Sequence, residues 1–144
     1  KLLPVMSLKS KIVFLKEVPA GTPISYGGIY TTSKKTTIAT VALGYADGYS
    51  RLLSNRGTVL VRGKRAPVAG RVCMDYTMLD VGEVLLAGEG DEVVAFGSQG
   101  CAEIGADELA RMLGTISYEI LCNTGKRVPR VYCEEGKVKD IKIF

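Results

Sequence analysis

Short runs of apolar and β-branched residues, broken at close intervals by glycine or proline, dominate the first two thirds of the chain. Runs of this length and composition are typical of strands rather than helices. Residues 11–18 end at Pro19-Ala20-Gly21, and residues 36–43 are closed by Gly44. A chain of 144 residues is large enough to bury one core. The pattern therefore predicts a mainly β fold, a compact β-barrel-like or sandwich domain over residues 1–144.

Further strands are expected in the middle and at the end of the chain. Residues 58–61 and 68–72 flank a polar segment and predict a hairpin whose turn carries Gly63. Residues 91–96 predict another strand. Residues 130–144 alternate around Glu135-Gly136 and predict a final hairpin. Its apolar positions are Val138, Ile141 and Ile143.

Helical periodicity is confined to the C-terminal half. The segment over residues 106–113 predicts a helix with Ile104, Leu109, Met112 and Leu113 near one face, and Gly114 supplies the expected stop. Ser117 is in the right place to cap a second helix that reaches about Asn123. We therefore expect one or two short helices beside the β structure.

The charged residues exclude several classes of function. The 19 basic and 15 acidic side chains give a net charge of +4 and form no block of like charge. So weak a field does not indicate a nucleic-acid partner. The chain has no histidine, which excludes Ser-His and Cys-His catalytic pairs and the usual zinc fingers. No metal site is expected.

The four cysteines stand far apart without a CxxC pair, which favours buried free thiols over disulfides. They are Cys73, Cys101, Cys122 and Cys133. No long apolar run indicates a membrane span or a signal peptide, so a cytoplasmic location is expected. The chain begins with Lys1 rather than methionine, which suggests a piece of something longer.

Four phrases occur in the order and at the separations that are characteristic of one enzyme family. They are Met6-Ser7-Leu8-Lys9-Ser10, Ser25-Tyr26-Gly27-Gly28, Gly44-Tyr45-Ala46-Asp47-Gly48-Tyr49-Ser50-Arg51 and Gly70-Arg71-Val72-Cys73-Met74-Asp75. A fifth is Ile116-Ser117-Tyr118-Glu119, followed by Arg127-Val128-Pro129-Arg130. Together they cover nearly the whole chain, which resembles the C-terminal domain of alanine racemases.

The resemblance implies a pyridoxal 5'-phosphate enzyme that interconverts L-alanine and D-alanine for peptidoglycan precursors. In that family an N-terminal (β/α)8 barrel carries the cofactor lysine, and this domain completes the site of the partner subunit in a homodimer. A barrel of about 250 residues does not fit into this chain. We therefore expect the isolated chain to bind no cofactor and to be inactive.

The resemblance assigns the catalytic role to Tyr26. Racemisation removes the α-proton from one face of a planar carbon and returns one to the other, so it needs two acid/base groups. The barrel lysine serves one face, and Tyr26 matches the family's tyrosine on the other. A free phenol has a pKa of about 10, so a tyrosine base needs nearby positive charge or donors, from arginines or from the barrel. The alternative is that Tyr26 only packs in a glycine turn.

Six further positions match family residues around the substrate. Met74 matches a residue whose backbone N–H binds the substrate carboxylate, although a core methionine would look the same. The positions that match the corridor from solvent to the cofactor are Tyr45, Arg51, Arg71, Ile116 and Tyr118. Tyr118 also corresponds to a position near the cofactor phosphate. Without the resemblance, the two arginines would be read equally well as solvated surface. Asp47 and Asp75 are expected to be local hydrogen-bond partners in turns.

Two departures from the family pattern leave the substrate open. Ile29 replaces the commoner threonine or serine, and Tyr76 stands where glutamine or methionine is more usual. A small amino acid is expected, with a racemase of serine or of a larger amino acid as the alternative. Two alternatives come from other classes of function. One is a β-barrel that binds single-stranded nucleic acid through its tyrosines, and the other is an interaction module without chemistry of its own. The absence of a basic stripe weighs against nucleic acid.

Overall fold

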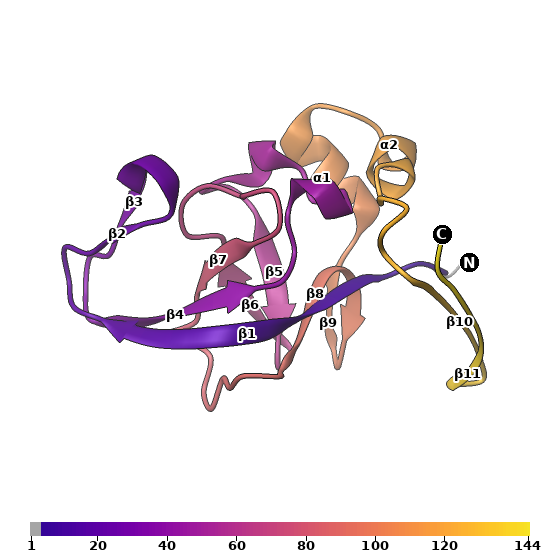
Figure 1. Ribbon diagram of the computed structural model, residues 1–144, viewed down its shortest axis with the longest axis horizontal. Helices are drawn as coiled ribbons and strands as arrows, with labels where there is room; N and C mark the ends of the chain where they lie inside the picture. Colours follow the sequence, from indigo (N-terminus) through magenta and orange to yellow (C-terminus); the bar gives the residue numbers. More distant parts are fainter. Residues whose placement is uncertain (1–3) are drawn as a thin grey trace.

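A computed structural model describes residues 4–144 and shows one main antiparallel sheet (Figure 1). Its seven strands run in the order β6-β5-β8-β1-β4-β7, and β9 pairs with β8. They are β1 (Leu8–Val18), β4 (Thr36–Val41), β5 (Thr58–Val61), β6 (Lys64–Pro67), β7 (Thr77–Asp80), β8 (Glu92–Gln99) and β9 (Ala102–Ile104). The prediction of a mainly β fold with short helices is confirmed.

The two ends of this sheet meet each other. β7 pairs with β4 along one side, and on its other side Leu79 forms a bridge with Val68, which directly follows β6. The amide of Ala69 also donates to the carbonyl of Met78, at 2.8 Å. The sheet therefore closes on itself into the expected barrel-like form.

The long strand β1 holds the two halves of the sheet together. Its first part, Leu8 to Lys11, pairs with β8, and its second part, Ile12 to Val18, pairs with β4.

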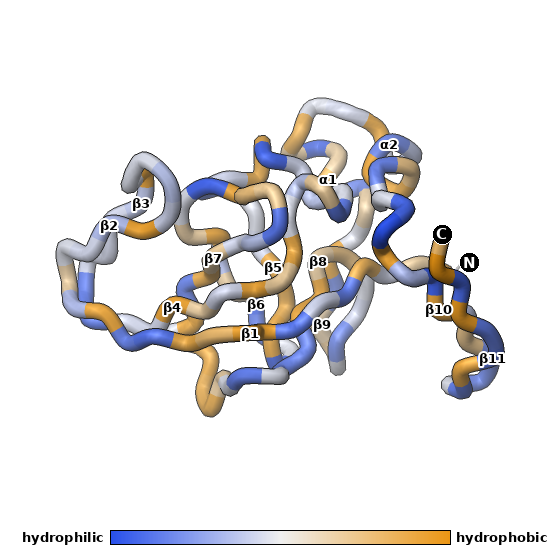
Figure 2. The backbone as a smooth tube through the Cα atoms, viewed as in Figure 1, coloured by the Kyte–Doolittle hydropathy of each residue, from blue (hydrophilic) through white to orange (hydrophobic). Residues whose placement is uncertain are grey.

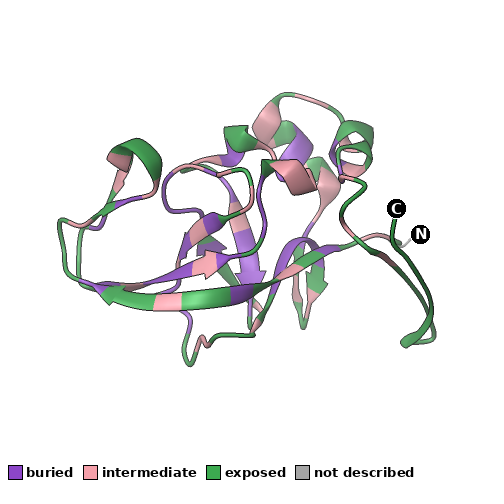
Figure 3. Cartoon of the chain, in the orientation of Figure 1, coloured by how far each residue is buried: buried purple, intermediate pink, exposed green. Residues whose placement is uncertain are grey.

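The central strand β8 is buried over five consecutive residues, 93–97, so both of its faces are covered (Figure 3). Stretches of strand that are hydrophobic in Figure 2 include those that are buried in Figure 3. Burial of this apolar surface is the main force that stabilises the fold.

The predicted central hairpin exists, but its second strand was assigned wrongly. The turn consists of Arg62 and Gly63 alone, with φ values of 51° and 72°. Two successive left-handed residues make a tight two-residue turn, so Val61 pairs with Lys64 and the second strand is β6. Residues 68–72 leave this hairpin and lead towards the cavity described below.

Two helices follow β9, as expected. α1 (Ala106–Leu113) has the predicted bounds, and Gly114 ends it with a φ of 72°. In α2 (Ser117–Cys122), Ile116 occupies the N-cap position without a capping side-chain hydrogen bond, and Ser117 is the first helical residue rather than the cap. Arg65 of β6 donates to Glu108 at 2.8 Å and so fastens α1 to the sheet. This ion pair lowers the pKa of Glu108.

Several small elements were not predicted. They are β2 (Pro23–Ile24), β3 (Tyr30–Thr31) and three 3-10 turns, η1 (Tyr26–Gly28), η2 (Tyr45–Asp47) and η3 (Arg51–Leu53). The strands β7 and β9 were also missed. The final hairpin, β10 (Arg130–Glu134) and β11 (Lys137–Lys142), was predicted, but it projects from the domain (Figure 1). Its apolar residues Val138, Ile141 and Ile143 are exposed rather than packed.

Two further expectations concern the state of the cysteines and the presence of a membrane-spanning helix. All four cysteines are free thiols, as predicted, but three of them are exposed and Cys73 is half-buried, so the expected burial was wrong. None of the helices in residues 4–144 is long and apolar enough to cross a membrane.

Candidate functional site

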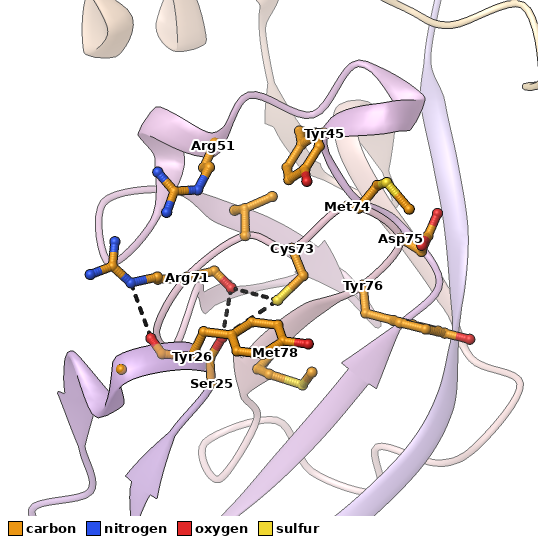
Figure 4. A pocket seen from close by; sticks show the side chains of 12 residues that line it. Ser25, Tyr26, Tyr45, Arg51, Arg71, Cys73, Met74, Asp75, Tyr76 and Met78 are labelled. Atoms are coloured by element: carbon orange, nitrogen blue, oxygen red, sulfur yellow. Dashed lines mark hydrogen bonds between the residues drawn. The ribbon is translucent and has the colours of Figure 1, made fainter.

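An open cavity of about 1030 Å³ lies where three loops converge (Figure 4). The loops are the bend after β2, the stretch from η2 to η3, and the segment that leads into β7. Five of the seven predicted site residues line it, namely Tyr26, Tyr45, Arg51, Arg71 and Met74. Ser25, Cys73, Asp75, Tyr76 and Met78 join them. Residues that are far apart in the sequence therefore share one concave surface.

The bend that carries Tyr26 is held in an unusual backbone conformation. Ser25, before the tyrosine, has a φ of 62°, and Gly27 after it has a φ of 71°. A non-glycine residue at positive φ is uncommon and needs support from its surroundings. The Ser25 hydroxyl supplies it by donating to the carbonyl of Arg71 at 2.9 Å. A Cβ at Gly70 would lie 2.6 Å from that of Ser25, so only glycine allows this approach.

The side chain of Tyr26 is presented to solvent. It is 75% exposed, whereas Tyr49, in the neighbouring loop, is 2% exposed and belongs to the core. Within residues 4–144 the buried Tyr49 hydroxyl has no hydrogen-bond partner, and burial raises its pKa. Tyr26 is thus not a core aromatic, and its hydroxyl is accessible on the surface that Tyr45, Arg71 and Met74 share.

Two arginines give this surface a positive character. Arg71 donates from Nε to the carbonyl of Tyr26 at 3.0 Å (Figure 4). This is a second link between the two loops, beside the bond from Ser25 to the carbonyl of Arg71. Within residues 4–144 neither Arg71 nor Arg51 forms an ion pair. Unpaired guanidinium groups around a cavity attract anions, and carboxylates in particular.

The loop around Met74 presents a free backbone donor. The carbonyl of Cys73 accepts from the amide of Tyr45 and that of Met74 accepts from Ala46, both at 3.0 Å. The C=O and N–H groups of a trans peptide point in opposite directions, so the N–H of Met74 points away from η2. Within residues 4–144 this N–H has no acceptor. It is therefore available to a bound carboxylate.

Gly44 allows this loop to lie against η2. A Cβ on residue 44 would fall 2.2 Å from the carbonyl oxygen of Met74, so Gly44→Ala must push the loop away. We expect this change to lower the free energy of unfolding by about 1–3 kcal/mol, as overpacking does. Urea unfolding of the two proteins measures it. Gly88→Ala is the matched control, because its new Cβ would meet no atom closer than 4.0 Å. Equal losses in both variants would contradict the close approach.

Asp47 and Asp75 have a shared partner that the sequence did not reveal. Asp47 accepts from the amide of Gly44 at 2.8 Å, the local turn bond that was expected. Both carboxylates also bind Arg127, Asp47 through Nε and Asp75 through Nη1, each at 2.8 Å. These hydrogen bonds raise the pKa of the Arg127 guanidinium. The expectation of a local turn partner is thus confirmed for Asp47, whereas the partner found for Asp75 is distant in the sequence.

Ile116 and Tyr118 lie outside this cavity. Ile116 directly precedes α2 and Tyr118 is the second residue of that helix. They are 63% and 74% exposed, respectively. Neither lines the cavity in residues 4–144. The structure thus leaves both side chains free on the surface.

The sequence matches the family model for the alanine racemase C-terminal domain over residues 5–132. The chain belongs to this family. It is 58% identical over 132 residues to the alanine racemase of Desulfosudis oleivorans, and 54% identical over 133 residues to that of Desulfovibrio desulfuricans. Each alignment covers 92% of this chain, but only 34% and 35% of the respective relative. This member of the family thus spans about a third of the length of the curated relatives it matches.

Solved structures of racemases contain the same fold. Alanine racemase from Bacillus anthracis, with bound L-Ala-P, superposes with a TM-score of 0.93 at 43% identity. The Clostridium difficile enzyme in complex with cycloserine gives 0.92 at 46% identity. Both cover 99% of this domain, and 36% and 37% of those chains. The racemase-family assignment therefore holds for fold and sequence alike.

Proposed function

We propose that this chain is the C-terminal domain of a pyridoxal-phosphate-dependent alanine racemase, in which the Tyr26 hydroxyl is one of two acid/base groups. The observation that carries the proposal is the exposed Tyr26 on the cavity that Tyr45, Arg71 and Met74 also line. The names of the relatives support alanine as the substrate. In a bacterial cell the product D-alanine would serve peptidoglycan synthesis.

The cavity offers donors for an anionic ligand, but another protein surface would have to supply the lysine that the cofactor needs. Two guanidinium groups, a free backbone N–H and aromatic side chains suit an anionic ligand with a small apolar part. None of the described residues that line the cavity is a lysine, so the amine that anchors the cofactor would come from a barrel domain. When bound, pyridoxal phosphate accepts the electrons left by the departing α-proton. Tyr118, by resemblance, would contribute near the cofactor phosphate.

The residues of this chain would bind the substrate and move one proton. The Met74 N–H would hold the substrate carboxylate, and Arg51 and Arg71 would draw it towards the cavity. Tyr45 and Tyr118 would narrow the corridor that leads inwards from solvent, which Ile116 also borders. The Tyr26 oxygen would take or give the α-proton on one face of the substrate. A lysine on the opposite face would do the converse.

The cavity is open, which suits completion by a partner. An active site must exclude water to strengthen its electrostatic contacts, and this surface alone does not do so. We propose that in the full-length enzyme, a homodimer, the partner subunit's barrel covers it. The alternative of a racemase for serine or a larger amino acid rests on Ile29 and Tyr76, of which Tyr76 lines the cavity.

A substrate comparison with the full-length, cofactor-loaded protein tests the proposal. L-Alanine, L-serine and L-lysine are incubated separately, and the D-enantiomer is measured by chiral chromatography. We expect kcat/KM for alanine to exceed that for serine by about tenfold, because one misplaced polar group in a small pocket costs about 1.4 kcal/mol. Faster turnover of serine would select the alternative. No racemisation of any of the three would overturn the proposal.

A further inference from the structure

Arg127 joins the two loops that carry Tyr45 and Met74, although it lines no part of the cavity in residues 4–144. We propose that Arg127 is a positioning residue for substrate binding. By clamping Asp47 and Asp75, it holds the main chain at Met74 in the orientation that receives a substrate carboxylate. The inference rests on the proposed function and identifies a residue on which substrate affinity depends.

The Asp47 half of the clamp is largely removed from solvent. The side chain of Asp47 is 14% exposed, and each of its oxygens has its own donor. Oδ2 accepts from the Gly44 amide at 2.8 Å and Oδ1 accepts from Arg127 at 2.8 Å. A carboxylate with so little water depends on its donors. Loss of Arg127 would leave Oδ1 of this carboxylate, on the last residue of η2, without its donor.

The Asp75 half of the clamp lies next to the proposed carboxylate donor. On the η2 side the loop is held through the carbonyls of Cys73 and Met74. Asp75, which is 40% exposed, ties the following residue to Arg127. This second attachment, through a side chain, restricts rotation of the loop about the two main-chain hydrogen bonds. Without it, the Met74 N–H would sample orientations in which it cannot reach the substrate.

The base of the clamp is itself anchored to η2. The amide of Gly125 donates to the carbonyl of Asp47 at 3.1 Å, and a Cβ on Gly125 would lie 2.7 Å from the carbonyl of Ala46. A Cβ on Gly48 would similarly lie 2.2 Å from the carbonyl of Asn123. The backbone just before Arg127 is therefore packed tightly on η2. The arginine thus reaches across to Asp75 from a closely packed backbone.

Arg127→Ala in the full-length enzyme tests the inference through substrate affinity. We expect KM for L-alanine and the competitive inhibition constant of propionate to rise by about tenfold, the size of one lost positioning contact of about 1.4 kcal/mol. The value of kcat should change far less, because Tyr26 is untouched. Inhibition by ethylamine, which has no carboxylate, should not change. Arg127→Lys retains the charge but replaces the planar guanidinium, whose Nε and Nη1 serve separate carboxylates, by a single ammonium, so it should lie between wild type and alanine.

Two further variants separate positioning from general stability. Arg62→Ala removes a comparable ion pair to Asp91, with side chains 46% and 22% exposed, from a turn that lines no part of the cavity. It should match Arg127→Ala in thermal stability and leave propionate inhibition unchanged. Asp75→Asn should weaken propionate as Arg127→Ala does, and the double variant should be no worse than Arg127→Ala.

Unchanged KM and propionate inhibition in Arg127→Ala would overturn the inference, as would a fall in kcat alone. Equal weakening of propionate in Arg62→Ala would do the same. The constants of each variant are compared with those of a wild-type enzyme that racemises alanine. If the wild type does not, the proposed function has failed instead.

Discussion

Tyr26→Phe in the full-length enzyme is expected to lower kcat for racemisation by about 10²–10⁴-fold in both directions, the usual contribution of a general acid or base. The change deletes one oxygen from an exposed side chain and leaves the ring, so the fold should be unaffected. One of two proton-transfer groups is lost, and inversion requires both. Chiral chromatography of D- and L-alanine measures the rate in each direction.

Isotope exchange makes this prediction specific to the role of the hydroxyl. The remaining base can still remove and return a proton on its own face, so α-deuterium should wash out from one enantiomer only. Tyr132→Phe is the matched control, since Tyr132 is a half-exposed tyrosine on β10, which lines no part of the cavity in residues 4–144. Full activity of Tyr26→Phe, or exchange that stays equal for both enantiomers, would exclude the assigned role.

Local patterns in the sequence predicted those elements whose signals are themselves local. Helix α1 was placed at its observed bounds, because an apolar face and a glycine stop lie within nine residues. The second strand of the hairpin of β5 and β6 was predicted too late in the chain. Its turn requires Arg62 in the left-handed conformation, which is uncommon for arginine and is not indicated by the residue type. β7 and β9 are only four and three residues long and gain their stability from partners distant in sequence.

The convergence of the site residues could not be derived from their spacing. Tyr26 and Arg71 meet because the sheet closes between Val68 and Leu79, which brings the loop before β7 to the bend after β2. Sequence resemblance identified these positions without explaining the geometry. The ion pair of Arg127 with Asp47 spans 80 residues and left no local signal. The motif Arg127-Val128-Pro129-Arg130 matches the family, but the connection of Arg127 to Asp75 appears only in the folded chain.

Met74→Pro is expected to abolish carboxylate binding, while Met74→Leu should leave it nearly intact. Proline removes the N–H that has no acceptor within residues 4–144. Loss of one charge-assisted donor of this kind costs about 10²–10³-fold, and here it should appear as a rise in KM and in the propionate inhibition constant. The Met74 side chain is 52% exposed, so leucine disturbs little packing. Both constants are measured on the full-length enzyme.

The two variants at one position separate a backbone role from a side-chain role. The Met74 carbonyl can still accept from Ala46 in the proline variant, which preserves that attachment to η2. Ethylamine, which lacks a carboxylate, should therefore still inhibit Met74→Pro, and this retained binding shows that the cavity has survived. Propionate inhibition that stays at the wild-type level in Met74→Pro would refute a main-chain donor at Met74. Weakening by leucine as severe as that by proline would instead place the contact on the side chain, because leucine keeps the N–H and loses only the thioether.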